Sequence, residues 1–362
     1  MGPTELTRDL AGIASHDDET EAGDYIERWL RDRTDGEVNR DRHGNVIARR
    51  GAGPQLALVG HHDVVPPADE QVDESGDYRI DRRDDRLFGR GTADMKGAVA
   101  AAMCAFRDAT LPDGELIFAS FVGEETGGRG ARGAIDDGFA PAYAIVGEGS
   151  TGYSAAGVTD VAIAHKGRRA STVQAEGVRA HASEPEAGKN AIYRASEAVE
   201  AIRDLAVPET DVLGRRLSGS LAVTEIEGGS AWNVIPDSCT ITVDERTVPG
   251  ERADLSSVAQ RPGISVDIEQ DLPPMACDEP QFADLLTDVA SSAQDGTPEQ
   301  ISKPHATDAG WLAGAGTTCV VCGPAEPGEA HTAEESVSLD VLDRCYTIYR
   351  RAAEQFAPRL IV

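Results

Sequence analysis

Lysine is the least used of the charged residue types in this chain. Of its 34 basic residues only four are lysines (Lys96, Lys166, Lys189 and Lys303), and the 63 acidic residues leave a formal net charge of −29. An acid excess of this size argues against nucleic acid or an anionic membrane as a partner. It predicts a halophilic protein whose self-repulsion is screened by high salt, with a moderately acidic cytosolic protein as the plainer alternative.

Cysteine and long apolar runs are scarce as well. The six cysteines are scattered over 362 residues, which argues against a disulfide framework. Cys319 and Cys322 form a CxxC inside the apolar stretch TTCVVC, and without a second pair nearby we interpret them as small core residues on a strand. The sequence shows no leader-like start and no run as long as a membrane span, so we expect a cytoplasmic protein without a membrane partner.

Short apolar segments alternate with amphipathic segments in the first half of the chain. QLALVG, ELIFASFVG and YAIVGE predict short, buried strands, and residues 4–14, 22–33 and 93–109 predict helices. Near the end the pattern resumes with a helix around FADLLTDVASSA, the strand TTCVVCG and a closing helix at 339–356. Buried strands that alternate with helices predict an α/β fold with a mostly parallel sheet, covered on both faces.

The middle of the chain has a different order of elements. A strand at 168–178 and a helix at 190–205 are followed by two strands of alternating polarity, a short helix at 251–260 and a strand at 263–271. The order β-α-β-β-α-β is typical of a ferredoxin-like α+β domain. The sequence therefore predicts a catalytic domain in two parts, 1–167 and 275–362, and an inserted domain at 168–274.

Residue types that bind metal ions follow several of the predicted strands. In open α/β sheets, sites collect at the carboxyl ends of the strands. Histidines and carboxylates gathered there indicate a metal centre rather than solvated strand ends. The candidates, each after a strand or at the start of a helix, are His61, His62, Asp63, Asp94, Glu124, Glu125, Glu148 and His331.

The two adjacent histidines cannot both face the same site. Side chains alternate along a strand, so His61 and Asp63 share a side and His62 points away. A histidine that binds a metal usually donates its other ring N–H to a carboxylate. We therefore expect His61 to bind metal and Asp63 to hold its orientation, with His62 as a packing or supporting residue.

Glu124 and Glu125 raise the same question, because adjacent side chains point in different directions. One of them can bind metal while the other holds a water molecule as general base. The alternative is a solvated Gly-Glu-Glu turn. The pattern of residues leaves open which glutamate has which role.

Several motifs together resemble those of the M20 metallopeptidase family, in particular its acetylornithine deacetylase and succinyl-diaminopimelate desuccinylase group. GHHDVVP resembles the family's GHxDVVP, and GRGTADMKG matches GRGxxDMKG. GEE, VGEGS, GVRAHAS, NVIP and TDAGWL follow in the family's order, and GPAEPGEAHTAEE resembles its ending. The resemblance covers nearly the whole chain. It implies that the smaller domain is a lid through which two chains form a homodimer.

The resemblance also implies a role for each matching residue. His61, Asp94 and Glu148 would bind one metal ion, and Asp94, Glu125 and His331 a second, so that Asp94 bridges the two. The peptide bond that follows Asp94 is implied to be cis. The remaining implied roles are general base for Glu124, orientation of His61 for Asp63, polarisation of the scissile carbonyl for His181, and substrate binding for Asn233, Arg246 and Thr307.

Nitrogen and oxygen ligands suit two divalent ions, most simply Zn²⁺, with Co²⁺ or Mn²⁺ as alternatives. The resemblance implies a small-molecule substrate, an N-acyl amino acid of the N-succinyl-diaminopimelate or N-acetylornithine type, cleaved to a carboxylate and a free amine. The segment ATDAGWL lacks the arginine of the desuccinylases' TSDGRF and looks more like the deacetylases, whereas the remaining motifs fit the desuccinylases equally well. A metallo-exopeptidase or dipeptidase, and a non-catalytic metal-binding scaffold, stand as alternatives, although the intact Glu124 argues against a scaffold.

Overall fold

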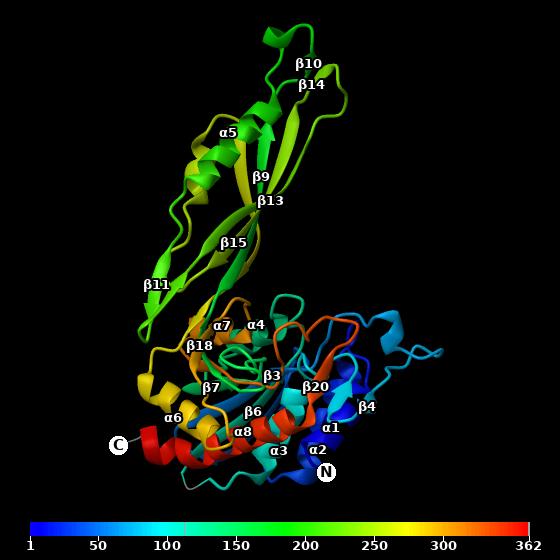
Figure 1. The fold of residues 1–362 in the computed structure, drawn as a ribbon, viewed down its shortest axis with the longest axis vertical. Coiled ribbons are helices and arrows are strands. Elements are labelled where there is room, and N and C mark those ends of the chain that lie inside the picture. Colours follow the sequence, from blue (N-terminus) through cyan, green and yellow to red (C-terminus); the bar gives the residue numbers. More distant parts are fainter. Residues whose placement is uncertain (112, 361–362) are drawn as a thin grey trace. The chain divides into compact units, whose positions relative to one another are not determined.

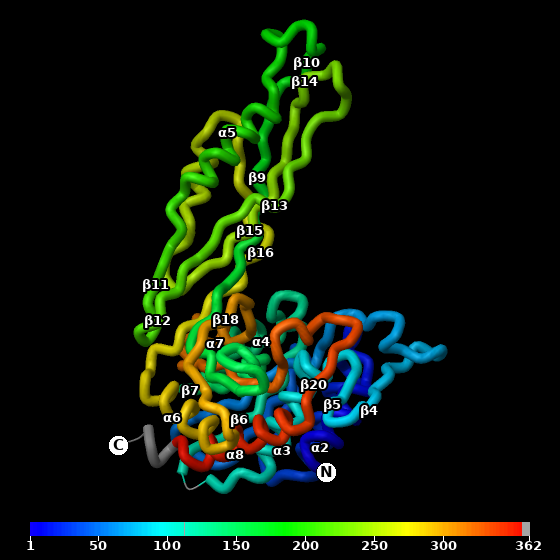
Figure 2. The backbone as a smooth tube through the Cα atoms, in the orientation of Figure 1, coloured from blue at the N-terminus to red at the C-terminus, as the bar shows by residue number. Residues whose placement is uncertain are grey.

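The structure, a computed structural model, describes residues 1–111 and 113–360 and divides into two compact units (Figures 1 and 2). Unit 1 comprises Met1–Ala164, Met275–Lys303 and the chain from Thr307 onwards. Unit 2 comprises His165–Pro274 and Pro304–Ala306. Unit 2 is thus inserted between two stretches of unit 1.

Unit 1 is built, within the described residues, on a nine-stranded sheet of order β1-β2-β6-β3-β7-β19-β8-β17, with β18 also paired to β8. The four neighbours β6, β3, β7 and β19 run parallel, whereas β1, β2 and β8 join by antiparallel pairing. This mostly parallel centre confirms the predicted fold class. The strands are β1 (Glu37–Arg40), β2 (Val46–Ala52), β3 (Gln55–His61), β6 (Gly114–Phe121), β7 (Tyr143–Val146), β8 (Val161–His165), β17 (Met275–Ala276), β18 (Gln300–Lys303) and β19 (Thr318–Val321).

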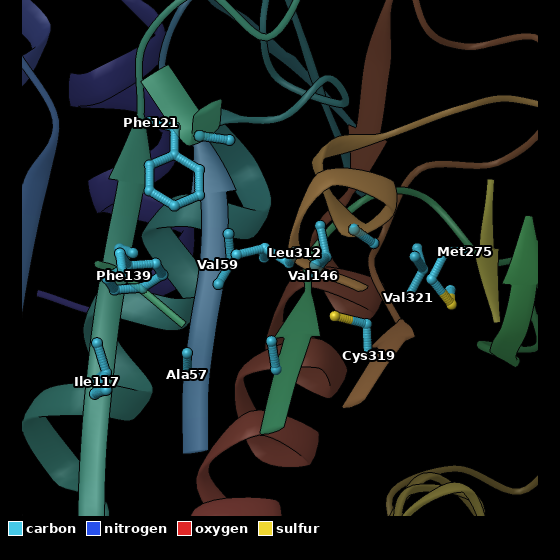
Figure 3. Close-up of a cluster of buried hydrophobic side chains, with 14 of the residues drawn as sticks. Ala57, Val59, Ile117, Phe121, Phe139, Val146, Met275, Leu312, Cys319 and Val321 are labelled. Atoms are coloured by element: carbon cyan, nitrogen blue, oxygen red, sulfur yellow. The ribbon is translucent and has the colours of Figure 1, made fainter. Parts of the chain in front are cut away.

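Helices cover both faces of this sheet, which explains why its central strands are apolar along their whole length. On one face Ala131 and Leu312, from helices α4 and α7, join side chains of the four parallel strands in one apolar core (Figure 3). On the other face α3 and α8 contact β3 and β6, and α1 packs on both helices (Figure 1). The helices of unit 1 are α1 (Pro3–Ala11), α2 (Thr20–Arg33), α3 (Lys96–Asp108), α4 (Arg129–Asp136), α6 (Pro280–Ser291), α7 (Asp308–Gly314) and α8 (Leu339–Leu360).

The start of α3 lies against the end of β3. A side-chain carbon at Gly60 would come within 2.9 Å of both the Met95 methyl and a Val99 methyl, so the close approach requires glycine. Nearly all of α3 is buried, and its many alanines suit a helix packed closely against a sheet. His61, which ends β3, and Asp94, which precedes α3, therefore reach the same edge of the sheet.

Several elements of unit 1 were not predicted from the sequence, including α4, α7, β8, β17, β18, a hairpin and a small sheet. The β1–β2 hairpin extends the central sheet, and a separate small sheet joins β4 (Asp81–Arg83), β5 (Arg86–Phe88) and β20 (Ser336–Ser338). β5 and β20 lie side by side although they are far apart in the sequence (Figure 2). Their pairing fixes the segment just before β20, which carries His331 and Glu335.

Unit 2 has the ferredoxin-like pattern in the part of the chain that the structure describes. Its sheet has the order β13-β15-β9-β16, with every neighbouring pair antiparallel, and α5 packs on one face. The helix predicted at 251–260 is wrong in type, because this segment forms a short 3-10 helix in which the Asp254 carboxylate accepts the Ser257 N–H three residues on. The elements are β9 (Gly167–Glu176), α5 (Ala191–Arg203), β13 (Ser220–Gly228), β15 (Ser238–Thr247), η3 (Leu255–Gln260) and β16 (Ile264–Leu272).

Smaller elements complete the fold. In unit 2, β10 (Ala180–His181) pairs with β14 (Val234–Ile235), and β11 (Glu209–Val212) forms a hairpin with β12 (Arg215–Ser218). All six cysteines lie within the described residues and are unpaired and buried, which confirms that they form no disulfide framework. None of the helices in the described part combines the length and hydropathy that a bilayer crossing requires.

Candidate active site

Three neighbouring strands deliver candidate site residues to one edge of the unit 1 sheet. His61 is the last residue of β3, Glu124 and Glu125 follow β6, and Glu148 follows β7. These strands are parallel and in register, with His61 opposite Phe121, the last residue of β6. Their carboxyl ends therefore meet, as expected for an α/β sheet. Asp94 joins them from the residues before α3, and His331 from the loop between β19 and β20.

The carboxylate of Asp94 lies between the two histidines. His61 Nε2 is 3.3 Å from Asp94 Oδ1, and His331 Nε2 is 3.1 Å from Asp94 Oδ2. On their other sides His61 lies 3.3 Å from Glu148 Oε1, and His331 lies 2.9 Å from Glu125 Oε1. Each Asp94 oxygen thus faces a different imidazole, which is the geometry that a bridging ligand of two ions needs.

His331 adopts an unusual backbone conformation, with φ of +63°. Left-handed φ values are uncommon for residues other than glycine and cluster at functional sites. The peptide bond between Asp94 and Met95 is cis, which confirms the expectation drawn from the family resemblance.

These side chains fit divalent ions. Within the described residues, potential ligand atoms lie within 4.8 Å of one another in two groups: His61 with Asp94 and Glu125, and His61 with Glu124 and Glu148. His61 Nε2 and Asp94 Oδ1 are both buried and make no hydrogen bond. A buried polar atom without a partner is costly, and a cation placed between these two would satisfy both.

The charges of the cluster point the same way. Hydrogen bonds that the His331 ring donates to the Asp94 and Glu125 carboxylates raise the pKa of His331 to about 10. Burial opposes protonation of His61, but Asp63, Asp94 and Glu148 still raise its pKa well above the ordinary value. Both imidazoles are therefore pushed towards the charged form by the surrounding carboxylates. Metal binding displaces such protons, because a divalent cation offsets the same negative charge more effectively.

Asp63 connects the ends of β3 and β6. Its carboxylate lies 3.4 Å from His61 Nδ1, and that nitrogen also lies 3.0 Å from the Asp63 carbonyl oxygen. The same carboxylate accepts the backbone N–H groups of Glu124 and Glu125, at 3.1 and 3.0 Å. The sequence suggested only the contact with His61. In the structure Asp63 also fixes the backbone of both glutamates.

Glu124 is a carboxylate of the cluster whose pKa is changed mainly by burial. Burial raises its pKa well above the ordinary value, and the charges of Glu148, Asp308 and Glu125 act in the same direction. A carboxylate of raised pKa beside a metal centre suits a proton acceptor and donor. His62 lies apart from the cluster and contacts Ser120 Oγ at 2.8 Å through Nδ1, as the alternation along β3 predicts.

Two buried charged residues of the site were missed by sequence reasoning. Glu335 Oε1 accepts the backbone N–H groups of Ala93 and Asp94, both at 3.1 Å, and Glu335 Oε2 accepts from Arg90 at 2.5 Å. Glu335 thereby holds the backbone that carries the Asp94 side chain. Its signal in the sequence is its place in the AHTAEE motif, but nothing there distinguishes it from its exposed neighbour Glu334.

The start of α7 carries Thr307 and a second missed residue, Asp308. Thr307 Oγ1 accepts the Ala309 N–H at 3.2 Å and caps the helix. Both carboxylate oxygens of Asp308 are buried and make no hydrogen bond, and burial raises its pKa to about 7. Near pH 7 the Asp308 carboxyl is therefore protonated in about half of the molecules. In its ionised form its negative charge raises the pKa of Glu124 further.

The remaining predicted residues, His181, Asn233 and Arg246, belong to unit 2. His181 lies exposed on β10 with Nδ1 2.6 Å from Ser183 Oγ. Its strand pairs with β14, and the Asn233 carbonyl accepts the Ala182 N–H at 3.0 Å, so His181 and Asn233 share one small sheet region (Figure 1). Arg246 on β15 donates through Nε to Asp244 at 2.8 Å.

Imidazoles and carboxylates that could hold cations, with a buried glutamate beside them, are typical of metal-dependent hydrolases. The family described as peptidase family M20/M25/M40 matches residues 57–355, and the chain belongs to it. The resemblance seen in the sequence is thereby confirmed. A dinuclear metal centre is typical of this family, and the side chains around Asp94 form groups that could hold metal ions.

Curated relatives and solved structures agree with the family. The acetylornithine deacetylase of Myxococcus xanthus is 29% identical over 331 residues, covering 86% of this chain and 84% of the relative. A probable succinyl-diaminopimelate desuccinylase of Staphylococcus aureus is 29% identical over 363 residues, covering 88% and 87%. The aminopeptidase PepT of Bacillus cereus shares the fold, with a TM-score of 0.81 at 20% identity over 98% of both chains. So does a dinuclear metal-binding M20 peptidase of Bacillus subtilis, with a TM-score of 0.68 at 16% identity over 99% and 98%.

Proposed function

We propose that the protein is a two-metal hydrolase that cleaves the amide bond of an N-acyl amino acid to a carboxylate and a free amine. The substrate is of the N-succinyl-diaminopimelate or N-acetylornithine type. One observation carries this proposal: the Asp94 carboxylate lies between His61 and His331, with one oxygen towards each. The two curated relatives act on N-acyl amino acids by name, which supports the substrate class.

The ions would be held by residues that the structure gathers in one cluster. His61, Asp94 and Glu148 are assigned to one ion, and Asp94, Glu125 and His331 to the other. Nitrogen and carboxylate ligands suit Zn²⁺ best, with Co²⁺ or Mn²⁺ as alternatives. When bound, two such ions supply Lewis acidity and lower the pKa of the attacking water.

Glu124 is the general base of the proposed reaction. It takes the proton of the attacking water and passes it to the nitrogen of the leaving amine. Its buried position supports this role, because the raised pKa brings proton uptake and release nearer to neutral pH. Asp63 positions Glu124 through the backbone hydrogen bond and keeps His61 oriented.

The candidate residues of unit 2, together with Thr307 of unit 1, are assigned to the substrate. His181 polarises the scissile carbonyl, Arg246 holds the carboxylate of the amino acid, and Asn233 and Thr307 complete the binding site. We propose a homodimer in which His181 acts in the site of the partner chain. Apolar side chains exposed on unit 2, among them Tyr193 at 70% and Ile226 at 52%, support a paired surface there.

An exopeptidase or dipeptidase is the second candidate function. The similarity in fold to an aminopeptidase favours it, since the same metal ligands and base would serve a peptide bond. The two functions differ in the group next to the scissile carbonyl. A dipeptidase must accept a free amino group there, whereas the proposed deacylase accepts an acyl chain.

A substrate panel decides between them. Protein loaded with Zn²⁺, Co²⁺ or Mn²⁺ in molar KCl is given N-acyl amino acids and dipeptides of matched side chains. The proposal expects kcat/KM for the best N-acyl amino acid to exceed that for the best dipeptide by at least about tenfold, roughly 1.4 kcal/mol of transition-state binding. A dipeptide as the best substrate would overturn it. High salt is chosen because we propose that the formal charge of −29 reflects a halophilic, cytoplasmic enzyme.

A further inference from the structure

Lys303 is a buried cation without a partner. Its side chain is 5% exposed, and among the described residues its ammonium has no ion-pair partner within 4.0 Å and no hydrogen-bond acceptor. The other buried cations of the described chain are all paired. Their partners are Glu335 for Arg90, Glu245 for Arg169 and the Ile13 carbonyl for Lys96.

The position of Lys303 in its strand is one where an apolar side chain is expected. Lys303 ends β18, and burial alternates along this strand so that Ile301 and Lys303 lie on the same side. Ile301 is part of the main apolar core of unit 1. A lysine at the next inward position buries its side-chain carbons beside the core, while its ammonium is left without a direct protein partner.

The compensating charges belong to the candidate active site. Burial lowers the pKa of Lys303, while the carboxylates of Glu148, Asp94 and Glu124 act against this effect. These residues are two of the proposed metal ligands and the proposed base. None of them lies within ion-pair distance of the ammonium, so Lys303 is near the cluster but is not neutralised by a direct contact.

A fold-stabilising role does not account for this arrangement. Lys96 shows what such a role looks like in this chain: it is fully buried, its ammonium donates at 2.6 Å to the Ile13 carbonyl, and it lies 5.9 Å from the Tyr78 ring centre. Lys303 has no contact of this kind. In a chain with only four lysines, an unpartnered one beside the metal cluster calls for a ligand.

We propose that Lys303 forms a carboxylate-binding subsite beside the metal centre, and that it takes the terminal carboxylate of a dicarboxylic acyl group. The inference rests on the proposed function, in which Arg246 already holds the carboxylate of the amino acid. Asp63 and Asp308 add further carboxylates to the four assigned to the ions and the base. Among the described residues none of these carboxylates lies within ion-pair distance of Lys303, so its ammonium is left to bind a carboxylate of the substrate. A succinyl-type acyl group supplies the matching negative charge, and an acetyl group does not.

The test compares two substrates that differ only in the acyl group, the N-succinyl and N-acetyl derivatives of one diamino acid. The wild-type protein is expected to prefer the N-succinyl compound. In Lys303→Met, which keeps the length of the side chain, the ratio of the two kcat/KM values should fall about 100-fold, because the acyl carboxylate loses its partner. Lys189→Met removes an exposed lysine and should leave the ratio unchanged. An equal loss for both substrates would overturn the proposal.

Two further measurements do not depend on turnover. Succinate should bind the metal-loaded wild-type protein in calorimetry, and Lys303→Met should lose this binding, with acetate as the control ligand. The melting temperature of Lys303→Met should not fall, since an unpaired buried charge is removed; a large fall would assign Lys303 to the fold instead. Should Lys303→Met fail to fold, Lys303→Gln repeats the comparison with a polar side chain.

The outcomes separate this inference from the function on which it rests. If the wild-type protein hydrolyses neither amide with any of the three metals, the proposed function is wrong, and succinate binding alone decides the role of Lys303. Succinate binding that depends on Lys303 then supports the subsite, and equal binding by wild type and Lys303→Met overturns it.

Discussion

The carboxylate of Glu335 accepts the backbone N–H of Asp94 at 3.1 Å, and so fixes the backbone of the proposed bridging ligand. The two residues are 241 positions apart, and Glu335 is itself held by Arg90 at 2.5 Å. All three side chains are at least largely buried. The geometry of the side chains proposed to bind the ions therefore depends on Glu335, which is not itself a proposed ligand.

Substitution of Glu335 should weaken metal binding without removing a ligand. In Glu335→Gln the amide can present its oxygen to the N–H groups or to Arg90, but its NH₂ group then faces a donor. We expect metal affinity to fall by about 10–100-fold, the range found when residues that support metal ligands are changed. Calorimetric titration with Zn²⁺ measures this. Glu334→Gln, a change at the exposed neighbour, is the matched control, and equal affinities in the two variants would contradict the role of Glu335.

His62 should make the protein sensitive to acid. Burial lowers the pKa of this imidazole to about 3, against about 6.5 in an unfolded chain. Below pH 6.5 the unfolded chain therefore takes up a proton that the native His62 does not, and the free energy of unfolding falls as the pH is lowered from about 6.5 towards 3. The slope is at most about 1.4 kcal/mol per pH unit.

The variant His62→Gln isolates this contribution. Denaturant midpoints of the metal-free proteins are measured between pH 7 and pH 4 in constant salt. The wild-type protein should lose stability faster than His62→Gln as the pH falls, so that the difference between the two shrinks. A difference that stays constant over this range would show that His62 is protonated to the same extent in the folded and unfolded states.

Subunit exchange should reveal whether His181 acts in the partner's site. His181→Ala removes one donor to the developing oxyanion and should lower kcat by about 10²–10³-fold, while Glu124→Gln removes the base. Mixed in equal amounts and allowed to exchange, half of the dimers pair one chain of each kind, and each of these has one intact site. Activity should return to roughly a quarter of the wild-type value. Heterodimers without recovered activity would place the action of His181 within its own chain.

Apolar runs and the alternation of side chains in the sequence were sufficient to predict most of the fold and part of the site. The apolar runs before His61 and Glu124 predicted parallel strands, and alternation along β3 correctly turned His62 away from the cluster towards Ser120. The order of elements in unit 2 predicted its sheet, because each strand and helix there has its own periodicity. The type of η3 was wrong, since a segment of six residues is too short for its periodicity to distinguish a 3-10 helix from an α-helix.

Residues whose role depends on distant contacts could not be found in this way. Glu335 and Glu334 are adjacent and identical in type, and only the pairing of β20 with β5 buries one of them. Lys303 is the last residue of the short strand β18, at a position where the alternation predicts an apolar residue. Its relation to Glu148 comes from the folded sheet. Asp63 was assigned to His61 alone, because its hydrogen bonds to the glutamates join two strands that are separated by a helix.

The most direct test of the account is to count metal ions and turnovers in Glu124→Gln. The wild-type protein and this variant should each bind two divalent ions per chain by elemental analysis after gel filtration, because Glu124 is assigned as the base and not as a ligand. His61→Ala should bind fewer. The kcat of Glu124→Gln on the best N-acyl amino acid should fall by about 10²–10⁴-fold. Turnover close to that of the wild type, or the loss of an ion from Glu124→Gln, would contradict the assignment of base and ligands on which the account rests.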